Sequence, residues 1–170
     1  MRHLLSSPEN KSFGAKRKGM RMRLLVCGNR DWTCVKTIDA WMRAVFFAAA
    51  RAGHDEFVLI EGEAEGVDTI AAAIFDRVIK AMFDKVPDGR FNVDIMRFPV
   101  HAYEWQTLGK RAGVVRNQRM FDEGQPTRCL AFGRLTKPNS DADSGTGNMV
   151  KICNQGGIVV TVVPNPGVLP

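Results

Sequence analysis

The chain has 170 residues, of which 45% are apolar, and it carries a formal net charge of +6. This length and apolar content predict one folded domain with a full hydrophobic core. No apolar run approaches the roughly 18 residues of a membrane-spanning helix, and the polar N-terminus lacks the apolar block of a secretory signal.

The excess positive charge is concentrated at the N-terminus. Residues 1–22 hold six basic side chains and one acidic side chain, whereas the remainder of the chain holds 18 basic and 17 acidic ones. We therefore expect residues 1–21 to form a basic, disordered extension. Contact with nucleic acid or an acidic partner is an alternative role for it. A further hypothesis places the natural start of the protein at Met20 or Met22.

Short apolar runs alternate with segments of helical periodicity over residues 22–164, and a short tail at 165–170 follows. The first run is apolar throughout, which is typical of a central parallel strand covered on both faces. The predicted strands are 24–27, 57–60, 93–99, 128–133 and 158–163, and the predicted helices are 35–52, 69–83, 110–122 and 148–154. This alternation predicts a single Rossmann-like, doubly wound α/β domain with a five-stranded, mostly parallel sheet.

Three loops follow the carboxyl ends of predicted strands and contain residues suited to phosphate. They contain, in chain order, Gly28, Asn29 and Arg30; Gly62, Gly66 and Asp68; and Ser144, Gly145, Thr146 and Gly147. Glycine lets a backbone approach a ligand closely, and a helix N-terminus offers N–H groups to an anion. Because open α/β sheets bind ligands at this edge, we expect the loops to converge on one nucleotide-type site. Ordinary turn chemistry is the alternative for each loop, and helix capping is the alternative for Asp68.

The third predicted helix carries a basic group. Arg116 and Arg119 lie three residues apart, on neighbouring positions of one face, where two arginines can clamp phosphate or carboxylate. Asn117 disfavours a helix unless its amide is used. The alternative is a solvated basic face, offset by Asp122 and Glu123.

Other catalytic and metal-binding patterns are absent from the sequence. Neither His54 nor His101 has a serine or carboxylate at the spacing of a hydrolase motif, and there is no HExxH, EF-hand or P-loop lysine pattern. The four cysteines form no CxxC pair, so we expect reduced thiols in a cytoplasmic protein. We expect no metal and no cofactor. Trp105 lies in a predicted loop that either covers the site or packs over an edge of the core.

Four ordered motifs carry a resemblance to a known family. They are VCGNRD at 26–31, EGEAEGVD at 61–68, GKRAGVVRNQRM at 109–120 and SGTGNM at 144–149. Together they resemble the SLOG superfamily of Rossmann-like nucleotide-binding domains, and within it the bacterial and phage branch called the YspA, cpYpsA-related SLOG family. The resemblance implies binding of a nucleotide, a nucleotide sugar or a related ligand such as ADP-ribose.

The resemblance also bears on catalysis. The LOG enzymes of this superfamily are phosphoribohydrolases with a Gly-Gly-x-Gly-Thr-x-x-Glu motif, whose glutamate takes part in the reaction. Here Met149 falls at the glutamate position, and Asp143 and Ser144 replace the paired glycines. A thioether cannot accept a proton or stabilise an oxocarbenium-like charge. A carboxylate of the second loop, Glu63, Glu65 or Asp68, is the candidate substitute.

These observations lead to three hypotheses. The first is binding, for sensing or sequestration, of a nucleotide-derived molecule. The second is an N-glycosidase that acts on nucleoside 5′-monophosphates or NAD-like substrates, with Glu63 and Asp68 as catalytic residues. The third is nucleic-acid association, as in the DNA-processing protein DprA. We expect no membrane partner. A homodimer or higher oligomer is expected through apolar helix residues such as Trp41, Phe46 and Phe47, whose alternative place is the core.

Overall fold

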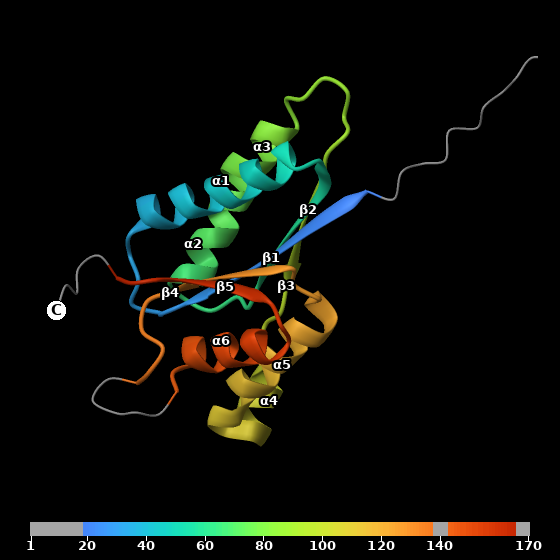
Figure 1. Cartoon of the computed structure of the whole chain (residues 1–170). Coiled ribbons are helices and arrows are strands. Elements are labelled where there is room, and N and C mark those ends of the chain that lie inside the picture. The colour runs from blue at the N-terminus through green and yellow to red at the C-terminus, as the bar shows by residue number, and fades with distance from the viewer. Residues whose placement is uncertain (1–18, 138–142, 166–170) are drawn as a thin grey trace, which may run out of the picture.

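The computed structural model describes residues 19–137 and 143–165 (Figure 1). Five parallel strands form one sheet in the order β3-β2-β1-β4-β5. The strands are β1 (Met20–Gly28), β2 (His54–Glu61), β3 (Asn92–Arg97), β4 (Arg128–Phe132) and β5 (Val159–Val163). The predicted Rossmann-like, doubly wound α/β fold is therefore confirmed.

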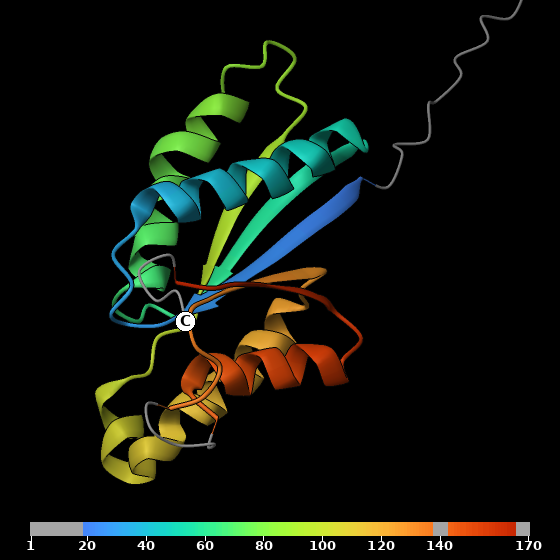
Figure 2. The ribbon, with the colours of Figure 1, turned by 60° about the vertical axis from the view of Figure 1, so that its left-hand side comes forward.

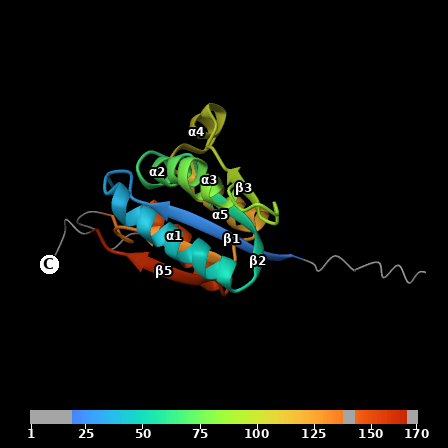
Figure 3. The ribbon, with the colours of Figure 1, turned by 90° about the horizontal axis from the view of Figure 1, so that it is seen from above.

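Helices cover both faces of the sheet (Figure 2). One face carries α1 (Val35–Arg51) and α2 (Val67–Ile74), which continues through a π-helical turn, η1 (Phe75–Ile79), into α3 (Lys80–Phe83). Figure 3, seen from the side of these helices, shows them lying in front of the sheet. The other face carries α4 (Ala102–Leu108), a 3₁₀ turn, η2 (Gly109–Arg111), α5 (Ala112–Gly124) and α6 (Gly145–Gln155).

Strand β1 separates two hydrophobic clusters, one under each helical layer. Leu24 and Val26 belong to the cluster on the α1–α3 side, and Leu25 and Cys27 to the cluster on the α5–α6 side. Successive strand residues point to opposite faces, so a run that is apolar at every position is buried on both sides, as predicted. Phe83 of α3 stacks on Phe57 of β2 with ring centroids 4.5 Å apart.

Several element boundaries differ from the sequence prediction. β1 begins at Met20, within the predicted extension, and Arg21 forms an ion pair with Glu56 of β2 at 2.7 Å. The prediction that α6 begins at residue 148 is wrong, because Ser144 caps a helix that begins at Gly145. Residues 1–18 and 166–170, which include most of the predicted extension and tail, lie outside the described residues.

The prediction of a loop around Trp105 is also wrong, because these residues form α4. Two hydrogen bonds between His101 and Glu104 begin the helix: the His101 N–H donates to Glu104 Oε2 at 2.7 Å, and the Glu104 N–H donates to the His101 carbonyl oxygen at 3.0 Å. Histidine is not a preferred capping residue, which is why the start of this helix is hard to recognise in the sequence.

The apolar residues proposed for oligomerisation divide between core and surface. Phe46 is buried, whereas Trp41 and Phe47 of α1 are partly exposed. In the described part of the chain, no helix is long and apolar enough to cross a bilayer.

Candidate functional site

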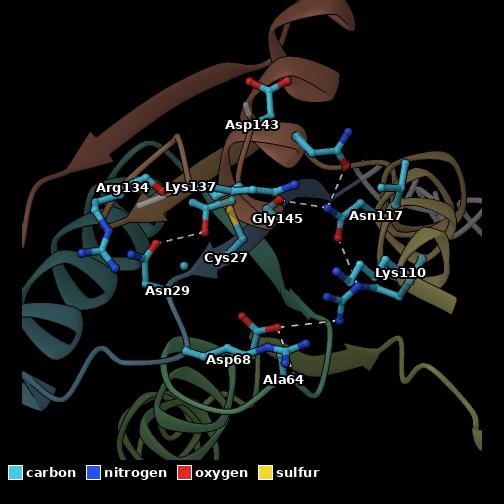
Figure 4. A pocket seen from close by; sticks show the side chains of 18 of the residues that line it. Cys27, Asn29, Ala64, Asp68, Lys110, Asn117, Arg134, Lys137, Asp143 and Gly145 are labelled. Carbon is cyan, nitrogen blue, oxygen red and sulfur yellow. Dashed lines mark hydrogen bonds and ion pairs between the residues drawn. The ribbon is translucent and has the colours of Figure 1, made fainter. Parts of the chain in front are cut away.

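A cavity of about 650 Å³ opens at the carboxyl ends of β1 and β4. The chain moves outward from β1 through β2 to β3 and then returns to place β4 on the other side of β1. Such a reversal of strand order is where open α/β sheets form their ligand crevice. Figure 4 shows side chains from both halves of the sheet around this hollow, with Asp68 on one side and Arg134, Lys137 and Gly145 on others.

The first predicted loop lines the cavity with Gly28, Asn29 and Arg30. A Cβ at Gly28 would lie 2.7 Å from the Phe132 carbonyl oxygen and would overlap Val67, so the close approach of β4 and α2 requires glycine here. The Asn29 N–H donates to the same carbonyl at 3.0 Å. The exposed Arg30 side chain has no hydrogen bond or ion pair with any other described residue.

The second predicted loop is only partly in the cavity. Asp68 lines it and accepts hydrogen bonds from the Gly62 N–H at 3.1 Å and from the Ala64 N–H at 3.4 Å. Asp68 therefore stabilises the loop between β2 and α2 through these two hydrogen bonds. The helix-capping alternative for it is wrong, because the N-cap of α2 is Gly66. Gly62 and Glu63 line an adjacent, smaller cavity instead.

Gly66 lies in neither cavity. It has a φ of +80°, and a Cβ there would lie 2.6 Å from the Asn29 carbonyl oxygen. Both observations require glycine. Its role in this structure is to let the first and second loops pack together.

The third predicted loop forms the first turn of α6. Ser144, Gly145 and Thr146 line the cavity, and the Ser144 hydroxyl oxygen accepts the Gly147 N–H at 3.0 Å as the N-cap. Thr146 is buried and donates to Asn29 Oδ1 at 3.4 Å, which joins the third loop to the first. Gly147 does not reach the cavity, because it packs against the backbone of Leu135.

The two predicted arginines of α5 have different surroundings. Arg116 lines both cavities, donates to the Gly62 carbonyl oxygen, and lies 3.9 Å from Asp68 Oδ2. Arg119 points elsewhere: it pairs with Glu104 of α4 at 3.1 Å and donates to the Pro99 carbonyl oxygen at 2.7 Å. Arg119 therefore fastens α4 to α5 and lies outside the cavity lining.

Asn117 lines the cavity, and its amide is fully used within the protein. Its Nδ2 donates to the Gly145 carbonyl oxygen at 3.0 Å and to Asn148 Oδ1 at 2.9 Å, and its Oδ1 accepts from Arg116 Nε at 3.1 Å. These bonds fix the N-terminal turn of α6 against α5.

Two buried carboxyl groups lie at the end of β2 and the start of α2. Burial raises the pKa of Asp68 to about 6, although Arg116 and the backbone N–H groups of Ala64 and Gly62 favour its charged form. Burial also raises the pKa of Glu61 to about 7; the N–H of Glu63 opposes that rise, and the charges of Asp68 and Glu63 add to it. Burial lowers the pKa of Arg116, against the attraction of Asp68. Asp68 and Arg116 line the cavity, and oppositely charged groups with shifted pKa values in a cavity are a common feature of functional sites.

Sequence reasoning missed several polar side chains of the cavity. Lys110, Arg134, Lys137 and Asn148 all line it. Arg134 pairs at 3.1 Å with Asp31, which also lines the cavity. Lys110 and Asn148 lie within the motifs at 109–120 and 144–149, although neither was singled out there, whereas Arg134 and Lys137 lie in no motif and only their position after a predicted strand could have indicated them.

The residue at the position of the LOG glutamate does not reach the cavity. Met149 is fully buried in the cluster on the α5–α6 side of the sheet. All four cysteines are free thiols. Within the ranges 19–137 and 143–165, no group of three or more His, Cys, Asp or Glu side chains is arranged to hold a metal ion.

Comparison with known proteins adds no assignment. No family model matches the chain, and neither the curated proteins nor the solved structures include a match. The case for a function therefore depends on the geometry of the cavity and on the motifs of the sequence.

Proposed function

We propose that this protein binds a phosphorylated, nucleotide-type small molecule, for sensing or sequestration, at the carboxyl edge of its sheet. The observation that carries the proposal is the position of the 650 Å³ cavity, at the reversal of strand order and against the first turn of α6. Its volume lies within the range of small-molecule sites. The SLOG-like motifs support the same ligand class.

The phosphate is assigned to the side of the cavity formed by α6. The first turn of a helix presents N–H groups and a partial positive charge, and Gly145 contributes no side chain there. Arg30 and Lys110 also line the cavity, and neither side chain has a hydrogen bond or ion pair with another described residue. Two cations that have no hydrogen bond or ion pair among the described residues are suited to neutralise a dianionic phosphate.

The proposal is tested by calorimetry with AMP, NAD, ADP-ribose and cyclic nucleotides. We expect Arg30→Ala and Lys110→Ala each to weaken the binding of a ligand that gives heat by about tenfold, the loss of roughly 1.4 kcal/mol. Arg51→Ala is the matched control, because Arg51 is an exposed cation at the far end of α1. If none of these compounds binds, the proposal is wrong.

A second candidate, an N-glycosidase, is favoured by Asp68. A carboxyl group with a raised pKa that lines a cavity is a candidate general base or nucleophile. With a pKa of about 6, Asp68 is mostly ionised at pH 7.5. This candidate predicts release of free base from AMP or nicotinamide from NAD by the native protein, and loss of release in Asp68→Asn. Retained release in Asp68→Asn would exclude Asp68 as the catalytic group, and binding without release would leave the first proposal alone.

A further inference from the structure

A second cavity, of about 330 Å³, lies beside the first. Four residues line both: Arg30, Ala64, Trp105 and Arg116. The two spaces therefore adjoin along a boundary that carries two guanidinium groups. The other lining residues of the smaller cavity come from the β2–α2 loop and from Val100, which lies between β3 and α4. A volume of this size is at the lower end of the range for small-molecule sites.

Trp105 gives the smaller cavity an aromatic wall. Its side chain is 43% exposed, and no aromatic or cation–π contact among the described residues involves its indole. A partly exposed indole that lines a cavity is a stacking surface for a planar ring.

Two carboxylates of the β2–α2 loop supply hydrogen-bond acceptors. Glu65 is exposed and has no hydrogen bond or ion pair with another described residue. The Glu63 carboxylate has only a long ion pair, with 3.9 Å between its Oε1 and Arg97 Nε. The Glu63 backbone is nevertheless fixed, because its N–H donates to the buried Glu61 Oε2 at 2.5 Å. Carboxylates accept hydrogen bonds from N–H groups and repel phosphate. The smaller cavity therefore suits a neutral ring that carries N–H donors, whereas the boundary suits an anion.

We propose that the smaller cavity is a base subsite, selective for nucleotides whose base carries an amino group. The base stacks on Trp105 and directs its amino group to Glu63 or Glu65. The phosphate extends past Arg30 and Arg116 into the larger cavity. This inference rests on the proposed function, because it needs a nucleotide whose phosphate lies in the larger cavity.

The test compares ligands with and without a base. Titrations use AMP, IMP, CMP, UMP and ribose 5-phosphate. We expect AMP to bind at least tenfold more tightly than IMP, and we expect the same advantage for CMP over UMP. In IMP and UMP an oxo group replaces the amino group, and this oxo group faces a carboxylate. We expect Trp105→Leu, which keeps an apolar side chain without a ring, to weaken the binding of AMP about tenfold. It should weaken the binding of ribose 5-phosphate far less, because that ligand has no base to stack on the indole. Trp105→Phe should retain AMP binding.

Two further variants complete the test. Tyr103→Ala is the matched control, since Tyr103 is an exposed aromatic residue on the same helix that lines neither cavity. Glu63→Gln combined with Glu65→Gln should reduce the preference for AMP over IMP. If AMP binds equally well to the native protein and to Trp105→Leu, the base subsite is wrong and the proposed function stands. If neither ribose 5-phosphate nor any nucleotide binds, the proposed function itself fails.

Discussion

The two glycine-containing segments on either side of the cavity use their backbone N–H groups in opposite ways. In the β2–α2 loop, residues 62–66, acidic side chains accept hydrogen bonds from these N–H groups. Asp68 accepts from the N–H groups of Gly62 and Ala64, and Glu61 accepts from the N–H group of Glu63. At the β4–α6 junction, residues 144–147, the neutral Ser144 hydroxyl takes only the N–H of Gly147.

This difference separates two sequence features that look alike. A glycine before a helix indicates an anion site only where the N–H groups remain available to a ligand. The β2–α2 loop has already satisfied the N–H groups of Gly62, Glu63 and Ala64 with carboxylates, so it presents negative charge to the cavity. The β4–α6 junction keeps a helix N-terminus facing the cavity. The two segments therefore favour opposite ends of a polar ligand.

The largest expected effect concerns the glycines of the β4–α6 junction. A Cβ at Gly147 would overlap the Leu135 carbonyl oxygen, whereas nothing lies within 4 Å of a Cβ at Gly145. We expect Gly147→Ala to lower the free energy of unfolding by about 3 kcal/mol. Gly145→Ala should change it by no more than about 1 kcal/mol, in the stabilising direction. Urea denaturation measures both, and equal effects would show that the junction is not tightly packed.

An intermediate effect is expected at Glu61, the last residue of β2, which accepts the Glu63 N–H of the β2–α2 loop. The pKa of Glu61 is about 7 in the folded protein and 4.5 in its ordinary environment. The folded state therefore holds this proton more tightly than the unfolded state, and the carboxyl group costs stability as pH rises from about 4.5 to 7. We expect Glu61→Gln to raise the free energy of unfolding by about 2 kcal/mol at pH 8 and to change it little at pH 4.

The control for this prediction is Glu65→Gln, which changes an exposed carboxylate of the adjoining β2–α2 loop. It should not produce the gain in the free energy of unfolding at pH 8, because it removes no buried carboxyl group. A gain in Glu61→Gln that is larger at pH 4 than at pH 8 would contradict the raised pKa.

The smallest expected effect concerns the cap of α6. The Ser144 hydroxyl accepts the Gly147 N–H and lies 2.9 Å from the carbonyl oxygens of Arg134 and Leu135, to which it can donate. We expect Ser144→Ala to lower the free energy of unfolding by about 1 kcal/mol. Ser144→Thr should retain most of the stability. Ser144→Asp keeps the acceptor but loses the donor, so native-like stability in Ser144→Asp would mean that only the cap matters.

The fold and the position of the cavity could be predicted from local sequence patterns. The apolar run ending at Gly28 indicates a central strand, and parallel strands bring the loops after them to one edge. Gly28, Asp68 and Gly145 accordingly line the same cavity. Such patterns do not depend on which side chains meet across the fold, which is why they can be recognised in a single sequence.

The partners of individual side chains could not be predicted in this way. Arg116 and Arg119 are neighbours on one helix, yet only Arg116 lines the cavity, because Glu104 and the Pro99 carbonyl oxygen engage Arg119. That outcome depends on α4, whose start at His101 is not a usual capping sequence. Lys110 and Arg134 reach the cavity only through tertiary packing.

The π-helical turn between α2 and α3 bears on how this chain tolerates changes in length. Each hydrogen bond in a π-helical turn joins residues i and i+5, one residue farther apart than in an α-helix. The segment Phe75–Ile79 therefore contains one residue more than a regular helical turn, while the helical segments on either side keep their orientation. Removal of one residue there would convert the turn to regular α-helix and keep Phe83 stacked on Phe57. The same deletion within α1 would rotate everything after it by about 100° and expose its apolar stripe. The helix that follows the β2–α2 loop is therefore a place where this domain can lose a residue while its cavity stays in register.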